Sequence, residues 1–145
     1  MNLGNVVRFR KQVEDLIKEE LALAEWAKSQ EKAQEQGLRQ DMNHLASELE
    51  QKLPHGVSGA YLAERYRWLE QAGQTLERHA ESIKRHDDTI AGLQNKLKEA
   101  YQARRVIELI MAKEHAKQKQ RFHRMEQREH DDLVNLRYLH TDSVT

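Results

Sequence analysis

Cysteine is absent from the 145 residues, proline occurs once, and only six glycines are present. Without cysteine the chain can form no disulfide framework and no cysteine-based zinc site. No apolar run approaches the ~20 residues that a helix needs to span a bilayer, and the first ten residues lack the apolar core of a signal peptide. These absences favour a cytoplasmic chain with no direct insertion into the bilayer.

Apolar residues are also scarce. Only 38% of the residues are hydrophobic and 33% are charged, which leaves too little apolar material for a sizeable globular core. This mixture is typical of long, solvent-exposed helices, and it predicts an all-α protein.

The single proline lies in the stretch 53–59, which separates two long helical patterns. Pro54 removes a backbone donor, and Gly56 and Gly59 can adopt positive φ at little steric cost. Ser58 is a good N-cap for a second helix. The stretch therefore predicts a tight bend rather than one kinked rod.

The predicted fold is an antiparallel two-helix coiled-coil hairpin with a longer C-terminal helix. We expect a single unit over residues 1–145, with a first helix over about 6–52, a turn over 53–59, a second helix over about 60–139 and a tail over 140–145.

Apolar residues of the first helix follow steps of three, four or seven, which indicates a packing seam. Its members are Val6, Phe9, Val13, Leu16, Leu23 and Ala27, then Leu38, Met42, Leu45 and Leu49. The eleven-residue step from Ala27 to Leu38 predicts a stutter. Gln30, Glu31 and Gln34 fill that interval, so we expect the seam to pack weakly there.

The second helix carries a strict heptad repeat of apolar residues: Leu69, Leu76, Ile83, Ile90 and Leu97. Folding about the bend pairs residues whose numbers add to roughly 112, which places Leu97 near Leu16, Ile90 near Leu23 and Leu69 near Met42. The first helix ends opposite Val106 in this register. Residues 107–139 are then expected to lack an intramolecular partner.

This remaining stretch is apolar along one side and basic. Its apolar residues are Ile107, Ile110, Met111, Phe122, Met125, Leu133, Leu136 and Leu139. Residues 103–128 contain eight Lys or Arg against three acidic residues, whereas residues 14–52 contain ten acidic residues against five Lys or Arg. The apolar side predicts either self-association or docking to a partner protein. Glu114 and Glu126 interrupt the basic run, so nucleic acid is not expected.

Candidates for chemistry are few. His79 and His86, like His123 and His130, share a helix face but lie ~10 Å apart along the axis, too far to share one metal ion. A solvated surface is the expected place for them. There is no phosphate-binding loop, nucleophile motif or HExxH helix. We expect no enzymatic activity, no metal and no cofactor.

Aromatic residues gather just after the bend, at Tyr61, Tyr66 and Trp68. A two-helix stem has little depth in which to bury them all. They can close the end of the hairpin or form an exposed docking face together with Leu38, Met42 and Leu45 of the first helix.

Two segments resemble the flagellar export protein FliJ family. One begins Gly56-Val-Ser-Gly-Ala-Tyr-Leu and continues through Tyr66-Arg-Trp-Leu69 and Leu76-Glu-Arg-His79; the other is Glu129-His-Asp-Asp-Leu-Val-Asn-Leu-Arg-Tyr138. The resemblance extends over essentially the whole chain. It implies a cytoplasmic coiled coil like a rotary ATPase stalk, peripherally attached to the inner face of the membrane at the flagellar base.

The resemblance also implies partners and sites. The partners are the export ATPase hexamer, the membrane export gate and export chaperones, with the chain itself a monomer or weakly self-associating. Gate-binding residues would be Leu38, Met42, Leu45, Trp68, Ala72, Thr75 and His79. ATPase-binding residues would be Val6, Phe9, Val13, Ile110, Lys117, Arg121, Phe122, Met125, Leu133 and Leu136. An injectisome stalk protein of the same architecture, or a homodimeric scaffold without an ATPase, remains open as an alternative.

Overall fold

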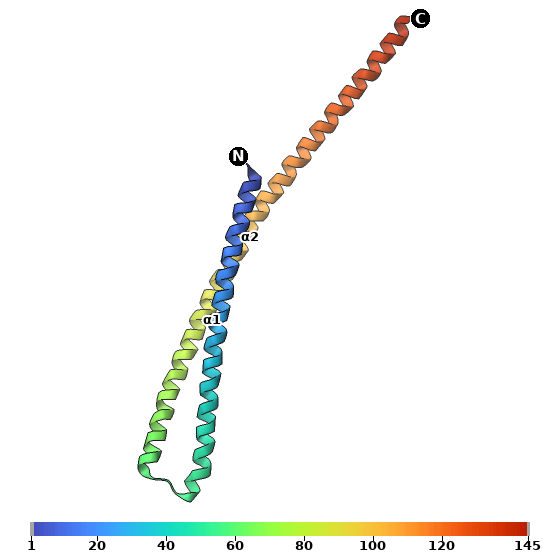
Figure 1. Cartoon of the computed structure of the whole chain (residues 1–145). Helices are drawn as coiled ribbons and strands as arrows, with labels where there is room; N and C mark the ends of the chain where they lie inside the picture. The colour runs from blue at the N-terminus through green and yellow to red at the C-terminus, as the bar shows by residue number, and fades with distance from the viewer. Residues whose placement is uncertain (1, 145) are drawn as a thin grey trace. The chain divides into compact units, whose positions relative to one another are not determined.

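A computed structural model describes residues 2–144 of the chain, with side chains as far as Thr141. It consists of helix α1 (Leu3–Lys52), a 3-10 turn η1 (Leu53–His55) and helix α2 (Gly59–Val144), which Figure 1 labels and colours along the chain. No strand occurs among the described residues. The predicted all-α helical hairpin is therefore confirmed. Thr145, at the end of the expected tail, lies outside the described residues.

Helix α1 begins earlier than expected because Asn2 caps it. The Asn2 side-chain oxygen Oδ1 accepts a hydrogen bond from the backbone N–H of Gly4 at 3.0 Å, and the Asn2 carbonyl accepts from Asn5 at 3.2 Å. Asparagine is among the best N-caps because it satisfies an amide that has no partner within the helix. The start at Leu3 therefore follows from a cap that the apolar pattern beginning at Val6 does not reveal.

The bend has the chemistry that the sequence predicts. Pro54 lies in the first turn of η1, which Gly56 closes with φ of 85°, the only positive φ in the described chain. The hydroxyl oxygen Oγ of Ser58 accepts a hydrogen bond from the N–H of Tyr61 at 3.1 Å, so Ser58 is the N-cap of α2. Gly59 instead takes the first helical position of α2.

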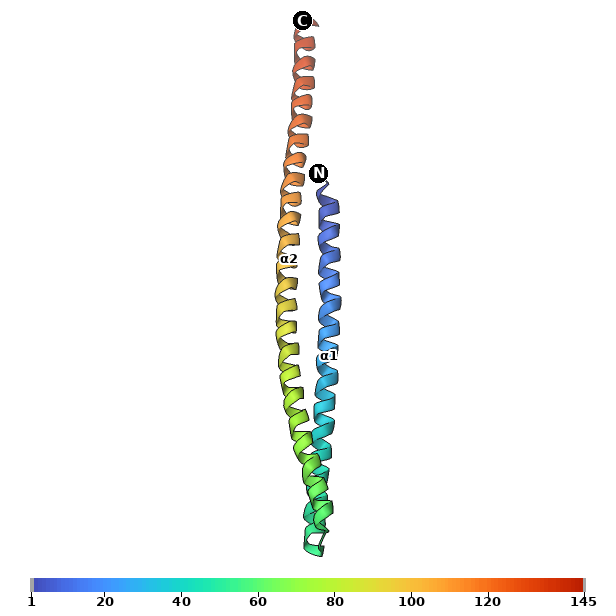
Figure 2. The same cartoon turned by 90° about the vertical axis from the view of Figure 1, so that its left-hand side faces the viewer.

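The chain divides into two compact units, and residues 13–99 form one of them. In this unit α1 and α2 run antiparallel from the bend and lie side by side in the two views of Figures 1 and 2. Polar contacts between the helices join residues whose numbers add to between 109 and 117. The register agrees with the expected value of roughly 112.

The side of α1 that faces α2 differs from the prediction. Most of its buried and half-buried residues follow an unbroken four-three repeat, which we term the inner seam: Glu14, Ile17, Leu21, Ala24, Lys28, Glu31, Glu35, Leu38, Met42, Leu45 and Leu49. Leu16 and Leu23 are instead 59% and 68% exposed, so their expected pairing with Leu97 and Ile90 is wrong. The stutter is wrong as well, because the inner seam keeps its repeat from Glu14 to Leu49, and Gln30 and Gln34 are exposed.

The heptad of α2 packs as predicted. Its five apolar residues, Leu69, Leu76, Ile83, Ile90 and Leu97, are all half-buried. A second line three residues further on completes the contact face and includes Ala72, His79, His86 and Leu93. Among the residues whose side chains the structure describes, only Leu45, Leu49, Ala72 and Leu93 are buried apolar residues, at 5–8% exposure, because two helices alone cannot enclose a deep core.

The other unit comprises residues 1–12 and 100–145. Leu3, Val6 and Val7 of α1 are half-buried, as are Ile107 and Met111 of α2, whereas every side chain from Ala112 to Thr141 is exposed. The expectation that pairing ends at Val106 is therefore wrong by about one and a half helical turns. We term residues 112–139 the distal segment.

We predict that replacing Leu49 with alanine lowers the free energy of unfolding by about 2 kcal/mol or more, because it leaves a cavity in the inner seam. The matched change Leu23→Ala, at an exposed site, should cost less than about 0.5 kcal/mol. Urea unfolding followed by circular dichroism on dilute protein measures both. Equal losses would mean that the packing seam passes through Leu23 after all.

Candidate interaction surfaces

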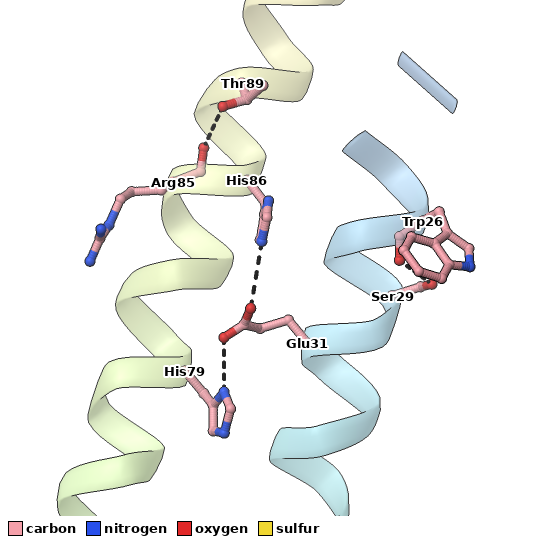
Figure 3. A network of polar contacts seen from close by, with 7 residues as sticks. All are labelled: Trp26, Ser29, Glu31, His79, Arg85, His86 and Thr89. Carbon is pink, nitrogen blue, oxygen red and sulfur yellow. Dashed lines mark hydrogen bonds and ion pairs between the residues drawn. The ribbon is translucent and has the colours of Figure 1, made fainter. Parts of the chain in front are cut away.

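Polar side chains cross the hairpin near its middle, in a cluster that we term the polar belt: Lys28, Glu31, His79, His86 and Asp87. Figure 3 shows its central part, in which the carboxylate of Glu31 points from α1 toward two imidazoles on α2. Glu31 Oε1 lies 2.8 Å from His79 Nδ1, and Oε2 lies 3.6 Å from His86 Nε2. Because an ionised carboxylate can only accept, Nδ1 of His79 carries the hydrogen in this contact.

A second ion pair extends the belt, between Lys28 Nζ and Asp87 Oδ1 at 2.5 Å. The hydrogen bond from His79 lowers the pKa of Glu31, and contacts with Ser82 and His86 act in the same direction against partial desolvation. The hydrogen bond from Lys28 likewise lowers the pKa of Asp87. Both carboxylates are thus held in their charged form by groups on the opposite helix.

The polar belt corrects the expected place of two histidines. His79 and His86 lie in the contact face, with side chains 18% and 27% exposed, rather than on a solvated surface. The sequence did contain a signal for this location. The seven-residue spacing places both imidazoles in the same line of α2 as Ala72 and Leu93, which are buried. Glu31 was expected in a weakly packed part of the seam, and its contacts with the two histidines were not predicted.

A compact group of polar and aromatic side chains surrounds the first turn of α2. The hydroxyl of Tyr61 lies 3.4 Å from Glu48 Oε1, and Lys52 forms an ion pair with the same carboxylate oxygen at 2.7 Å. The guanidinium of Arg65 lies 5.0 Å from the centre of the Tyr61 ring. Tyr61 therefore closes the hairpin end, which was one of the two predicted roles for the aromatic residues.

Trp68, in contrast, is accessible at the hairpin surface. It is 37% exposed and lines a shallow groove together with Asp41, His44, Leu45, Glu48 and Arg65. Tyr66 is exposed as well. The groove places one large aromatic surface beside charged groups of both signs.

The structure separates the expected gate-binding residues into two groups. Trp68 is accessible, and Leu38, Met42 and Thr75 are half-buried; the Thr75 hydroxyl donates to the Gln71 carbonyl at 3.0 Å. Leu45 and Ala72 are buried, and His79 contacts Glu31. The seven residues therefore do not form one exposed stripe.

The expected ATPase-binding residues are mostly accessible. Phe9, Ile110, Phe122, Met125, Leu133 and Leu136 are exposed apolar side chains, and Lys117 and Arg121 are exposed as well. Val6 and Val13 are half-buried. In the second unit, Arg104 and Arg105 both pair with Glu108, at 2.5 Å and 2.7 Å, and lower its pKa, Arg105 more than Arg104.

Helix α1 carries another four-three stripe, which we term the outer seam: Val13, Leu16, Glu20, Leu23 and Ala27. Each member precedes an inner-seam residue by one position, which is about 100° around the helix. Trp26 borders the stripe, is 62% exposed, and points away from α2 in Figure 3. The apolar pattern read from the sequence is therefore real, but α2 packs against a different side.

Metal and membrane sites are not evident. Within the described part of the chain, no three His, Asp or Glu side chains gather in a way that could hold a metal ion. Neither helix, over the same residues, offers a stretch long and apolar enough to cross a membrane.

Comparison with known proteins gives one match. The model of a protein family described as the flagellar FliJ protein matches residues 1–143. No curated protein and no solved structure matches the chain. The match extends over nearly the whole chain, and it favours the flagellar assignment over the injectisome alternative.

We predict that the stabilising effect of Glu31 depends on pH. Because its pKa is lowered from the ordinary 4.5, its contribution is present above about pH 4.5 and is lost as the pH falls through the lower value in the folded state. Glu31→Gln should therefore destabilise the hairpin at pH 6 and make much less difference near pH 3.

The matched control is Glu25→Gln, at an exposed position, which should change stability little at either pH. Thermal unfolding at the two pH values measures the effect. A gap between wild type and Glu31→Gln that stays the same at both would exclude a role for the charge of Glu31.

Proposed function

Because the chain belongs to the flagellar FliJ family, we propose that it is the stalk-like coiled coil that binds and activates the export ATPase hexamer. We further propose that it contacts the membrane export gate and escorts empty export chaperones, without catalysing a reaction itself. Family membership makes it a protein of flagellar export.

The distal segment supports the ATPase assignment most directly. It is helical and exposed throughout, and its apolar side chains include Phe122 at 64% and Leu136 at 63% exposure. Such side chains are the kind that a partner covers. The basic stretch 113–128 would speed encounter with an acidic surface and fade with salt, because exposed charges are screened over about 8–10 Å near physiological ionic strength.

Four residues outside the distal segment complete the proposed ATPase surface: Val6, Phe9, Val13 and Ile110. Phe9 and Ile110 are exposed in the same unit, so both are available to the ring. Val6 and Val13 are half-buried, and their proposed role is to hold α1 in place rather than to present a large contact area.

Trp68 is the proposed anchor for the export gate. Large aromatic residues in a partly enclosed site dominate many protein interfaces, and Trp68 lies in the groove that Asp41 and His44 border. Ala72 and Leu45 are buried, so we assign them to supporting this surface from within. Met42 and Leu38 lie at its edge on α1.

The proposed location follows from these partners. Contact with the gate would hold the chain peripherally at the inner face of the membrane, at the flagellar base, while the distal segment engages a cytoplasmic ATPase. The injectisome alternative would use the same surfaces, so only the family match separates it from the flagellar role.

We predict that Phe122→Ser combined with Met125→Ser raises the concentration needed for half-maximal stimulation of the cognate export ATPase by about tenfold or more. Both side chains are exposed, so the fold should be unchanged. The control pair Gln118→Ser and Gln127→Ser, on the same segment, should leave stimulation intact. Undiminished stimulation by the first variant, measured as ATP hydrolysis, would refute the assignment.

We predict that Trp68→Ala weakens binding to the export gate by about tenfold or more while helicity is retained. The matched control is Trp26→Ala, an exposed tryptophan far from the bend in sequence, which should bind normally. Calorimetry with the cytoplasmic part of the gate measures affinity, and circular dichroism measures helicity. If both variants bound equally well, Trp68 would not be the anchor.

A further inference from the structure

The outer seam of α1 has the spacing of a coiled-coil contact, and its central members Leu16, Glu20 and Leu23 are exposed. Leu16 and Leu23, seven residues apart, are 59% and 68% exposed. A four-three repeat of this kind is the pattern on which a partner helix packs. We propose that the outer seam binds residues 113–128 of a second copy of this chain.

Charge complementarity identifies this occupant. Between residues 15 and 27 the chain carries four acidic residues, Asp15, Glu19, Glu20 and Glu25, against the single Lys18. Residues 113–128 carry six Lys or Arg against two Glu, together with the exposed apolar Phe122 and Met125. A helix that is both basic and apolar is therefore what the outer seam would attract, and every copy of the chain carries one.

The two surfaces also match in length. Val13 to Ala27 spans about 21 Å of helix axis, and residues 113–128 span about 22 Å. Either surface could instead pair with the same surface of a second copy. Like charges would then lie close together, because Glu19 and Glu20 would face acidic residues and Lys117 and Arg121 would face basic ones. Like-charge pairing of this kind opposes association, so the unlike pair is favoured.

The pairing joins two different surfaces, so it is heterologous unless two copies exchange their stretches reciprocally. A reciprocal exchange gives a closed dimer, and a one-way contact gives larger assemblies as the concentration rises. Both raise the average mass above the 17.1 kDa of one chain. The proposal does not rest on the ATPase role and is tested without any other protein.

The experiment uses sedimentation equilibrium of the full-length chain over a concentration series at low and high salt. We expect self-association that weakens with salt, because screening reduces the attraction of exposed charges. Leu16→Ser combined with Leu23→Ser should weaken it by about tenfold or more, while Leu53→Ser, at an exposed leucine outside the seam, should not. Helicity should be unchanged in all of them.

Charge reversal distinguishes the possible pairings. Glu19→Lys with Glu20→Lys, and separately Lys117→Glu with Arg121→Glu, should each abolish association. The chain with all four changes should associate again, because the reversed charges beside its outer seam would attract the reversed charges within its residues 113–128. If only one of the two pairs of changes mattered, a surface would be pairing with itself, and the proposal would be wrong.

A wild-type chain that remained monomeric at every concentration and salt would also overturn the proposal.

Discussion

Contact between only two helices is the constraint on which the structure depends. A side chain between two helices is covered from one direction and open to water at its flanks, so only four apolar residues in the described part of the chain are buried. Stability must therefore accumulate along the seam, each pair contributing a small amount of buried area. In a hairpin of this kind, no single cluster of side chains provides most of the stability. Partners can therefore bind at either end without disturbing a common hydrophobic core.

The polar belt shows what such a seam can use in place of apolar packing. Glu31 contacts His79 and His86, while Lys28 pairs with Asp87. A shift of the helices by one heptad would leave Glu31 beside only one histidine, with Ala72 or Leu93 in place of the other, and would separate Lys28 from Asp87. Polar groups in coiled-coil seams are known to fix register at some cost in stability. The belt thus offers an explanation for how a long, weakly apolar seam keeps one alignment.

The sequence predicted the elements and register more reliably than the faces. Pro54, Gly56 and Ser58 located the bend, and the pure leucine and isoleucine heptad located the contact face of α2. The predicted contact face of α1 was wrong, because the clearest apolar repeat of this helix, through Leu16 and Leu23, is the outer seam and not the side that packs against α2. Its inner seam contains Glu14, Lys28, Glu31 and Glu35, which hydrophobicity alone assigns to solvent. Lys28 and Glu31 have partners on the opposite helix, and a pattern within one helix does not contain those partners.

The composition of the distal segment has a consequence for the thermodynamics of any contact that it makes. Residues 112–128 consist mainly of Ala, Lys, Gln, Arg, Glu and Met, with no glycine or proline, and these are strong helix formers. The helix is therefore largely preorganised before a partner arrives, so binding need not supply the backbone entropy that a disordered segment loses on folding. More of the interaction energy is then available as affinity, and a short exposed stretch can bind through few side chains.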